Sequence, residues 1–245
     1  PLYSSAASDV YKRQNYVLPE IEKSLKNKVV CKSIRTTGVP ESILQEKITD
    51  IINANNEKCD IAFLPHRMLG VDIRLTSSDN QLVEDLINEI VPRIKKYVYG
   101  YDNDKLEQVI ADLLIKNNLT VSTAESCTSG LLASRLTDVP GSSRYFKGGS
   151  VCYSNELKIN DIGIDKDLIE RHGAVSEEVA KSLAKNIAQK NNTDLGIGIT
   201  GIAGPDGGTE KKPVGLVFVG IFYKNNLYIK KLSLIHISEP TRPLY

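Results

Sequence analysis

The chain has 245 residues, of which 41% are hydrophobic, and its 31 lysines and arginines nearly balance its 30 aspartates and glutamates, giving a formal net charge of +1. This length and apolar content allow one large domain or two small ones, each with a packed core. The scattered, balanced charge argues against a nucleic-acid-binding stripe, and the short apolar runs argue against a membrane-spanning helix.

The cysteines and histidines argue against disulfide and metal chemistry. The four cysteines are isolated, with no C-x-x-C pair and no secretory signal, which indicates reduced thiols in a cytoplasmic protein. The three histidines are far apart in the sequence, so we expect no metal site, and nothing in the sequence calls for a cofactor.

Both ends of the chain resemble translated sequencing adapters. The resemblance covers almost all of residues 1–14 and 232–245, so we interpret both segments as assembly artefacts and exclude them from the fold. Residues 15–27 are then expected to be the tail of a preceding domain, with a short amphipathic helix over 15–25.

Residues 28–101 are expected to form a small α/β domain. Apolar residues at helical spacing predict helices that begin at Pro40 and near Asp79, the second of them kinked at Pro92. Short apolar, β-branched runs predict three strands, at 28–34, 60–64 and 71–75. The polar, turn-rich stretch 99–104 predicts the domain boundary.

Such a unit can resemble a KH module, so RNA binding is an alternative function. A KH module grips nucleotides through a G-x-x-G loop, and the glycines of this unit, Gly38, Gly70 and Gly100, cannot form one. We therefore favour a structural spacer. The RNA alternative predicts tight, salt-dependent binding of RNA.

Residues 102–231 form the second expected domain. Its first helix, from Leu106, is expected to be capped by Asp102 or Asp104. A strand at 119–122 then runs through small and hydroxyl residues into a helix from Leu131, with Ser126 and Thr128 where that helix is expected to begin. Unpaired N–H groups at such a turn can hold an anion or a developing oxyanion, although Ser and Thr there are also ordinary helix caps.

Two later stretches have the same strand-to-loop character. A short strand at 150–153 is expected to turn into a helix, which places Tyr153 and Lys158 near the exit of the strand. The apolar strand that starts at Leu195 runs into a glycine-rich loop, 200–208, whose backbone can approach a ligand closely. We favour a ligand loop over a plain wide connection.

Once other catalytic motifs are excluded, a serine nucleophile with a lysine base is the chemistry that the sequence still allows. The sequence holds no metal set, no G-x-S-x-G elbow and no P-loop. Ser182 and Lys185 match S-x-x-K, but they lie in the middle of an expected helix among surface lysines, so we interpret that match as fortuitous.

Several motifs in order resemble the C-terminal domain of the CinA (competence/damage-inducible) family, nearly continuously from Leu106 to Tyr223. The motifs are Thr123–Gly130, Pro140–Ser143, Tyr153–Glu156, His172–Ser176, Gly201–Gly208 and Lys212–Gly215. The stand-alone form of that domain is nicotinamide mononucleotide deamidase. The resemblance implies a three-layer α/β domain, preceded by a small KH-like α/β domain.

The resemblance also implies a serine/lysine amidohydrolase that converts nicotinamide mononucleotide and water to nicotinate mononucleotide and ammonia. Matched motif by motif, Ser126 is the nucleophile, Lys158 the general base and Tyr153 its assistant. The implied substrate-binding residues are Glu125, Cys127, Thr128, Asn155, Thr200, Gly201, Ala203, Gly204 and Pro205. A lysine acts as a base only when neutral, which burial near a strand end favours. The alternative is a catalytically silent module that binds pyridine nucleotides.

The sequence departs from the family at two places. Ser129 stands where the family usually has glycine, which serine tolerates only if the position needs no positive φ. The adapter-like segment from residue 232 replaces an arginine-bearing loop and a final helix, so we expect weak substrate binding and reduced stability. Beyond the small nucleotide we expect no nucleic-acid or membrane partner, and we consider a homodimer.

Overall fold

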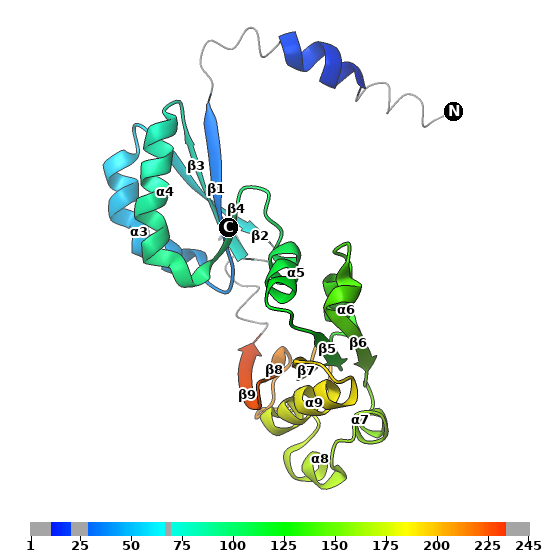
Figure 1. Cartoon of the computed structure of the whole chain (residues 1–245). Coiled ribbons are helices and arrows are strands. Elements are labelled where there is room, and N and C mark those ends of the chain that lie inside the picture. The colour runs from blue at the N-terminus through cyan, green and yellow to red at the C-terminus, as the bar shows by residue number, and fades with distance from the viewer. Residues whose placement is uncertain (1–10, 21–28, 67–69, 234–245) are drawn as a thin grey trace. The chain divides into compact units, whose positions relative to one another are not determined.

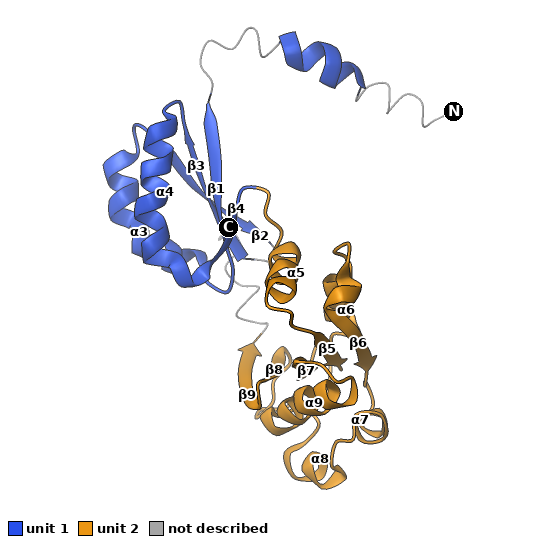
Figure 2. Cartoon of the chain, in the orientation of Figure 1, with its two compact units in different colours: residues 1–102 blue, residues 103–245 orange. Residues whose placement is uncertain are grey.

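The structure is a computed structural model. It describes residues 11–20, 29–66 and 70–233. Contacts divide the chain into two units, residues 1–102 and residues 103–245 (Figure 2), and each unit has its own sheet and its own apolar core.

The described N-terminal segment is helical over residues 11–20, with a π-helical centre, η1 (Arg13–Val17). The helical segment therefore begins before residue 15, inside the adapter-like segment, and residues 21–25 of the expected helix lie outside the described residues. Its apolar side chains, Tyr16 and Val17 among them, are exposed.

Unit 1 is a four-stranded antiparallel sheet with the strand order β2-β3-β1-β4. Helices α3 and α4 lie side by side over one face of it (Figure 1). The elements are β1 (Val30–Thr36), α3 (Glu41–Asn55), β2 (Asp60–His66), β3 (Gly70–Ser77), α4 (Asn80–Ile94), η2 (Lys95–Tyr97) and β4 (Val98–Tyr101). Alternate strand residues such as Ile34, Ile73 and Leu75 point into the core under the helices, as the period of a half-buried strand requires.

Two details of unit 1 differ from expectation and one agrees. The stretch expected to be a turn carries β4, because Val98, Tyr99 and Tyr101 are good strand formers and extend the sheet beside β1. Asp102 does not cap the next helix, since its carboxylate accepts a hydrogen bond of 2.8 Å from Ser33 N. The expected start of α4 near Asp79 is confirmed, and Asp79 caps the helix by accepting hydrogen bonds from the N–H groups of Gln81 and Leu82.

Unit 2 is a five-stranded sheet with the strand order β6-β5-β7-β8-β9, in which β6, β5 and β7 are parallel and β8 and β9 are antiparallel. Its helices are α5 (Leu106–Lys116), α6 (Leu131–Thr137), η3 (Ser142–Arg144), α7 (Asn155–Asn160), α8 (Lys166–His172) and α9 (Glu177–Lys190). Its strands are β5 (Val121–Glu125), β6 (Phe146–Val151), β7 (Leu195–Gly201), β8 (Leu216–Tyr223) and β9 (Asn226–Ser233). Helix α5 begins after Lys105, so neither expected aspartate occupies its N-cap position.

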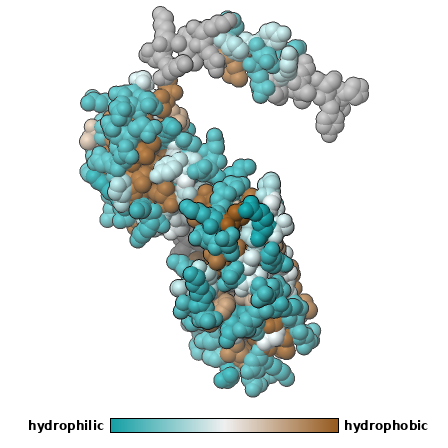
Figure 3. Space-filling view, viewed as in Figure 1, coloured by the Kyte–Doolittle hydropathy of each residue, from teal (hydrophilic) through white to brown (hydrophobic). Residues whose placement is uncertain are grey.

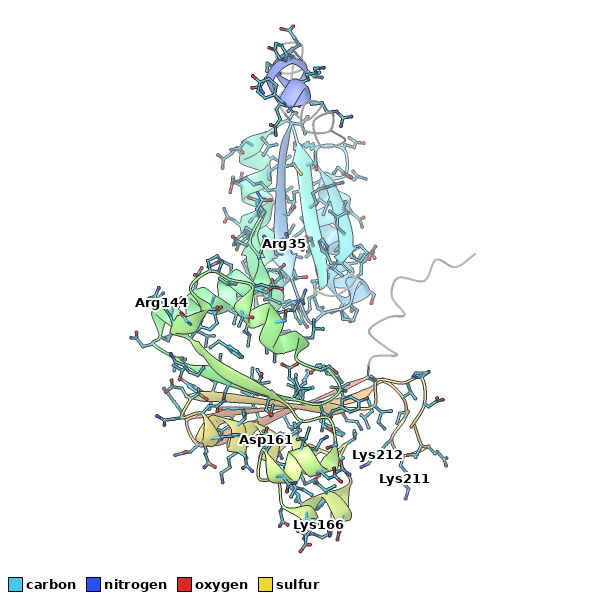
Figure 4. All side chains as sticks on the ribbon, turned by 90° about the vertical axis from the view of Figure 1, so that its right-hand side faces the viewer. Arg35, Arg144, Asp161, Lys166, Lys211 and Lys212 are labelled. Carbon is cyan, nitrogen blue, oxygen red and sulfur yellow. The ribbon has the colours of Figure 1, made fainter. Side chains whose placement is uncertain are left out.

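The expected three-layer α/β fold is confirmed. Seen from the side in Figure 4, the sheet of unit 2 has helices above and below it. Alternate residues of β5 enter different cores: Val121 packs with Ala111 and Tyr145 on one face, and Ala124 packs with Leu183 on the other. Figure 3 shows mostly hydrophilic residues on the visible face of this unit, as expected when the apolar side chains lie between sheet and helices.

Helix α9 lies directly on glycines of β7 and β8. A Cβ atom added at Gly198 would lie 2.5 Å from Ala180 O, and one added at Gly220 would lie 2.4 Å from the same oxygen. Real Cβ atoms do not approach backbone so closely, so these glycines set the distance between helix and sheet.

We expect Gly198→Ala to lower the free energy of unfolding by about 3 kcal/mol, because the helix must move away from the sheet. Gly38→Ala is the matched control. Its φ is +70° but a Cβ there would meet open space, so only backbone strain of about 1 kcal/mol is expected. Urea denaturation measures both, and an equal loss in the two variants would contradict the close packing.

Candidate active site

Three parallel strands end at one edge of the sheet of unit 2, and the expected site residues follow them. Glu125 at the end of β5 pairs with Val151 of β6 on one side and with Ile199 of β7 on the other. Ser126 comes directly after β5, and its N–H donates to Ile199 O at 3.0 Å. The carboxyl edge of an open α/β sheet is where such folds bind ligands.

Lys158 is the buried centre of this edge. It lies on α7, only 2% of its side chain is exposed, and its Nζ lies 3.1 Å from Ser126 Oγ. The same Nζ lies 2.9 Å from Cys152 O and 2.8 Å from Tyr153 O, the two carbonyls that follow β6. Burial lowers the pKa of Lys158 below its ordinary value, and the nearby thiols of Cys152 and Cys127 oppose that shift.

The three contacts of the lysine can also be made by a neutral amine. A neutral amine has two N–H donors and one lone pair, so it can donate to both carbonyls and accept a proton from the Ser126 hydroxyl. Ser126 is 7% exposed, so water competes little for that hydroxyl. The pair can therefore activate a serine oxygen as a nucleophile.

Two thiols flank the pair without being better nucleophiles. Cys152 is buried and Cys127 is half-buried. Burial raises the pKa of both thiols, an effect that Lys158 only partly offsets. At neutral pH both thus remain thiols rather than thiolates.

The loop that carries Ser126 differs from expectation. Helix α6 does not begin at Ser126 or Thr128; Gly130 occupies its N-cap position with φ of +91°. The amides of its first turn are bound by Glu125, whose Oε2 accepts from Leu132 N at 3.0 Å and whose Oε1 accepts from Ala133 N at 2.8 Å. The carboxylate thus caps α6, and the alternative in which Ser126 or Thr128 is an ordinary helix cap is wrong.

Three polar groups of the loop keep hydrogen-bonding capacity for a ligand. Within the described part of the chain, the N–H groups of Cys127 and Thr128 make no main-chain hydrogen bond. Thr128 Oγ1 is buried and has no partner among the described residues either. A buried polar group that lacks a partner is costly, so a bound carbonyl or hydroxyl group there would be stabilised.

Ser129 adopts the left-handed backbone conformation that we expected serine to tolerate poorly, with φ of +51°. This conformation is unfavourable for a non-glycine residue, because its Cβ atom makes close contacts with the backbone. We expect Ser129→Gly to raise the free energy of unfolding by about 1 kcal/mol, because glycine adopts this φ without that cost.

Ser134→Gly is the control for that variant, since Ser134 lies in the middle of α6. There glycine has no strain to relieve and should lower the free energy of unfolding by about 1 kcal/mol. Thermal melts of the two variants should shift in opposite directions. A shift to lower temperature in both would show that the turn at Ser129 is unstrained.

Tyr153 and Asn155 lie on the exposed side of the lysine. The side chain of Tyr153 is 69% exposed, and the residue reaches Lys158 through its main-chain carbonyl. It lies after β6 rather than inside it, because the strand ends at Val151. Asn155 is the exposed first residue of α7, which Ser154 caps by accepting from Leu157 N.

The glycine-rich loop is joined to the same edge by its first residues. Thr200 is buried and donates to Ala174 O at 2.8 Å, and a Cβ at Gly201 would lie 3.0 Å from Cys127 Sγ. The other expected substrate-binding residues of the loop, Ala203, Gly204 and Pro205, are exposed. Figure 4 shows Lys211 and Lys212 further along it, beyond the end of the sheet, where Lys212 Nζ donates to His172 O at 2.6 Å.

Sequence reasoning missed two roles at this edge. The carbonyl of Cys152 binds the lysine, and the carboxylate of Glu125 caps α6. A main-chain acceptor leaves no signal in residue types. The position of Glu125, a few residues before a short helix, is a sequence signal for its role, because acidic residues commonly cap helix N-termini.

Other site classes find no support in the described residues. No helix among them is both long and apolar enough to cross a bilayer. Their histidines, cysteines and carboxylates form no group of three or more that could hold a metal ion. Cys31, Cys59, Cys127 and Cys152 are free thiols.

Comparisons with protein families cover both units. Residues 103–239 match the CinA C-terminal domain, and residues 31–100 match the Damage-inducible protein CinA KH domain. The chain is similar to a CinA-like protein of Dictyoglomus thermophilum, with 39% identity over 225 residues, which is 90% of this chain and 55% of that protein. The chain thus spans about half the length of the curated relatives it matches.

Solved structures give the same similarity for part of the chain. A competence/damage inducible protein from Agrobacterium tumefaciens has a TM-score of 0.51 and 36% identity, over 52% of this chain and 78% of that one. A CinA superfamily protein from Escherichia coli has a TM-score of 0.51 and 31% identity, over 52% of this chain and 74% of that one.

Proposed function

The chain belongs to the CinA family, and we propose that unit 2 is a serine/lysine amidohydrolase that deamidates nicotinamide mononucleotide. The observation that carries the proposal is the buried contact of 3.1 Å between Lys158 Nζ and Ser126 Oγ. A buried lysine beside a serine, with its pKa lowered by burial, is an arrangement that activates a nucleophile for attack on an amide.

The first half of the proposed reaction forms an ester. Ser126 Oγ attacks the carboxamide carbon of the substrate while Lys158 Nζ takes the hydroxyl proton. The oxygen that becomes negative is stabilised by the N–H groups of Cys127 and Thr128, which have no main-chain partner in the described structure. Lys158 then gives its proton to the leaving nitrogen, the carbon–nitrogen bond breaks, and ammonia departs.

The second half regenerates the serine. Water attacks the ester carbon, Lys158 takes a proton from that water, and the same oxyanion site holds the charge. When the ester bond breaks, the proton returns from Lys158 to Ser126 Oγ and nicotinate mononucleotide is released. The carbonyls of Cys152 and Tyr153 keep the amine aimed at the serine through both halves.

The remaining family residues would contact the nucleotide. The orphan hydroxyl of Thr128 and the glycine-rich loop from Thr200 to Pro205 lie around the same edge and are proposed to contact the substrate. Asn155 and Tyr153 would line its exposed side.

Ammonia release from nicotinamide mononucleotide by this chain tests the proposal. We expect release that depends on enzyme concentration, with nicotinate mononucleotide formed in equal amount. If calorimetry shows that the nucleotide binds but no ammonia appears, the silent binding module replaces the enzyme. If the nucleotide neither binds nor reacts, both are wrong.

A further inference from the structure

The residue before the nucleophile carries a carboxylate that the proposed reaction does not use. Glu125 is completely buried, and both of its carboxylate oxygens accept main-chain N–H groups of α6, from Leu132 and from Ala133. A carboxylate with no solvent contact and no cationic side-chain partner among the described residues is costly to bury. A buried carboxylate next to Ser126 therefore indicates a role other than packing.

The main chain of the same residue holds the other side of the site. Glu125 O accepts from Cys152 N at 2.8 Å, and Cys152 O in turn lies 2.9 Å from Lys158 Nζ. One residue thus joins three parts: the end of β5, the first turn of α6 and the segment that holds the lysine. The loop Ser126–Gly130 runs between the first two of these.

We propose that Glu125 is a positioning residue that clamps the Ser126–Gly130 loop between β5 and α6 and so fixes Ser126 Oγ against Lys158 Nζ. The function it serves is the hydrolysis proposed above, on which this inference rests. The residue does not contact substrate, because its two oxygens are already bound and its side chain is buried.

The clamp also determines which main-chain amides can bind the oxyanion. The first-turn amides of α6 are taken by Glu125, so they are not free to bind a developing negative charge. The amides of Cys127 and Thr128 belong to the clamped loop itself. Shifting the loop would then displace the nucleophile and the oxyanion donors together, while the lysine stays in place.

The test compares Glu125→Gln, which keeps one strong acceptor, with Glu125→Ala, which keeps none. We expect kcat for ammonia release to fall about tenfold in the first variant and about 100-fold in the second, with KM unchanged within about twofold, because only the placement of reacting groups is lost. Asp165→Ala is the matched control, since Asp165 caps α8 through Asp167 N at 2.9 Å. It should leave both kinetic constants unchanged.

A second measurement reports on the serine without the nucleotide. Phenylmethylsulfonyl fluoride reacts with a serine that has a base beside it, forming an oxygen–sulfur bond and releasing fluoride. The rate constant for labelling Ser126, followed by mass spectrometry on folded protein, should fall in parallel with kcat in both Glu125 variants. A merely structural role would reduce the amount of folded protein but not this rate constant.

Three outcomes would overturn the clamp. The first is full kcat in folded Glu125→Ala, and the second is a loss confined to KM, which would make Glu125 a substrate contact. The third is an unchanged labelling rate in Glu125→Gln, which decides the matter if the alanine variant does not fold. If the parent chain releases no ammonia, the proposed reaction is wrong, and the labelling rates alone decide whether Glu125 positions Ser126.

Discussion

Ser126→Ala is expected to lower the rate of ammonia release from nicotinamide mononucleotide by about 10⁴-fold or more, because the oxygen that forms the ester is lost. Substrate binding should persist, since Ser126 contributes one small, buried hydroxyl to the site. A coupled assay for ammonia measures the rate, and calorimetry measures nucleotide binding in the same protein.

The control is Ser143→Ala, which removes an exposed hydroxyl of the same unit. It should leave the rate unchanged. The parent protein should trap a covalent adduct on Ser126 when the reaction is quenched with acid, and Ser126→Ala should trap none. A variant that retains the parent rate would place the nucleophile at another residue.

Some elements of the fold could be predicted well, because their local sequence preferences agree with the tertiary structure. Helix α9 shows this agreement, because its apolar residues recur at helical spacing and Ser176, a residue type that favours the N-cap, accepts from Val179 N at its start. The expected KH-like unit and three-layer unit are likewise present, because strands and amphipathic helices alternate with clear breaks between them.

The elements that differ from expectation depend on tertiary contacts that the residue types alone do not indicate. The polar look of the stretch around Tyr99–Asp102 predicted a turn, but pairing with β1 makes it a strand. The hydroxyls of Ser126 and Thr128 left a helix cap as one alternative, but the carboxylate of Glu125 reaches across the loop and takes that role. In both cases a tertiary contact outweighed the local preference of the residue types.

The pairing of Ser126 with Lys158 came from the family resemblance more than from spacing. Thirty-two residues separate the two, so only the parallel arrangement of β5 and β6 brings their ends together. The acceptors that orient the lysine are main-chain carbonyls, which every residue carries. Sequence patterns can therefore suggest such a pair, while its geometry has to come from the fold.

Replacing the lysine gives the second large effect. Lys158→Met is expected to lower the rate of ammonia release by about 10³-fold, because the general base is lost while the apolar part of the side chain is kept. Lys185→Met is the matched control, since Lys185 is exposed on α9 in the S-x-x-K match that we interpret as fortuitous. That variant should keep the parent rate.

If the proposed activity is correct, the parent chain should also show the protonation of this lysine in its pH profile. We expect kcat/KM to rise with pH and to level off above the pKa of Lys158, which burial holds below 10.5. Below that pKa the side chain is an ammonium ion and cannot take the proton of Ser126. A profile of kcat/KM that is flat from pH 6 to pH 10 would contradict a lysine base.

The same pKa shift has a consequence for stability, with its sign set by proton binding. Between the lowered pKa in the folded chain and 10.5 in the unfolded chain, the unfolded state binds one proton more. The free energy of unfolding therefore rises with pH through this window and falls as the folded lysine becomes charged. Lys158→Met lacks this contribution, so its stability relative to the parent should decrease as pH is raised from 7 towards 10. Urea denaturation at several pH values measures this difference, and a constant difference would mean that Lys158 titrates alike in both states. Activity and stability thus both favour the neutral amine, since the ammonium form can neither accept the proton of Ser126 nor be buried without cost.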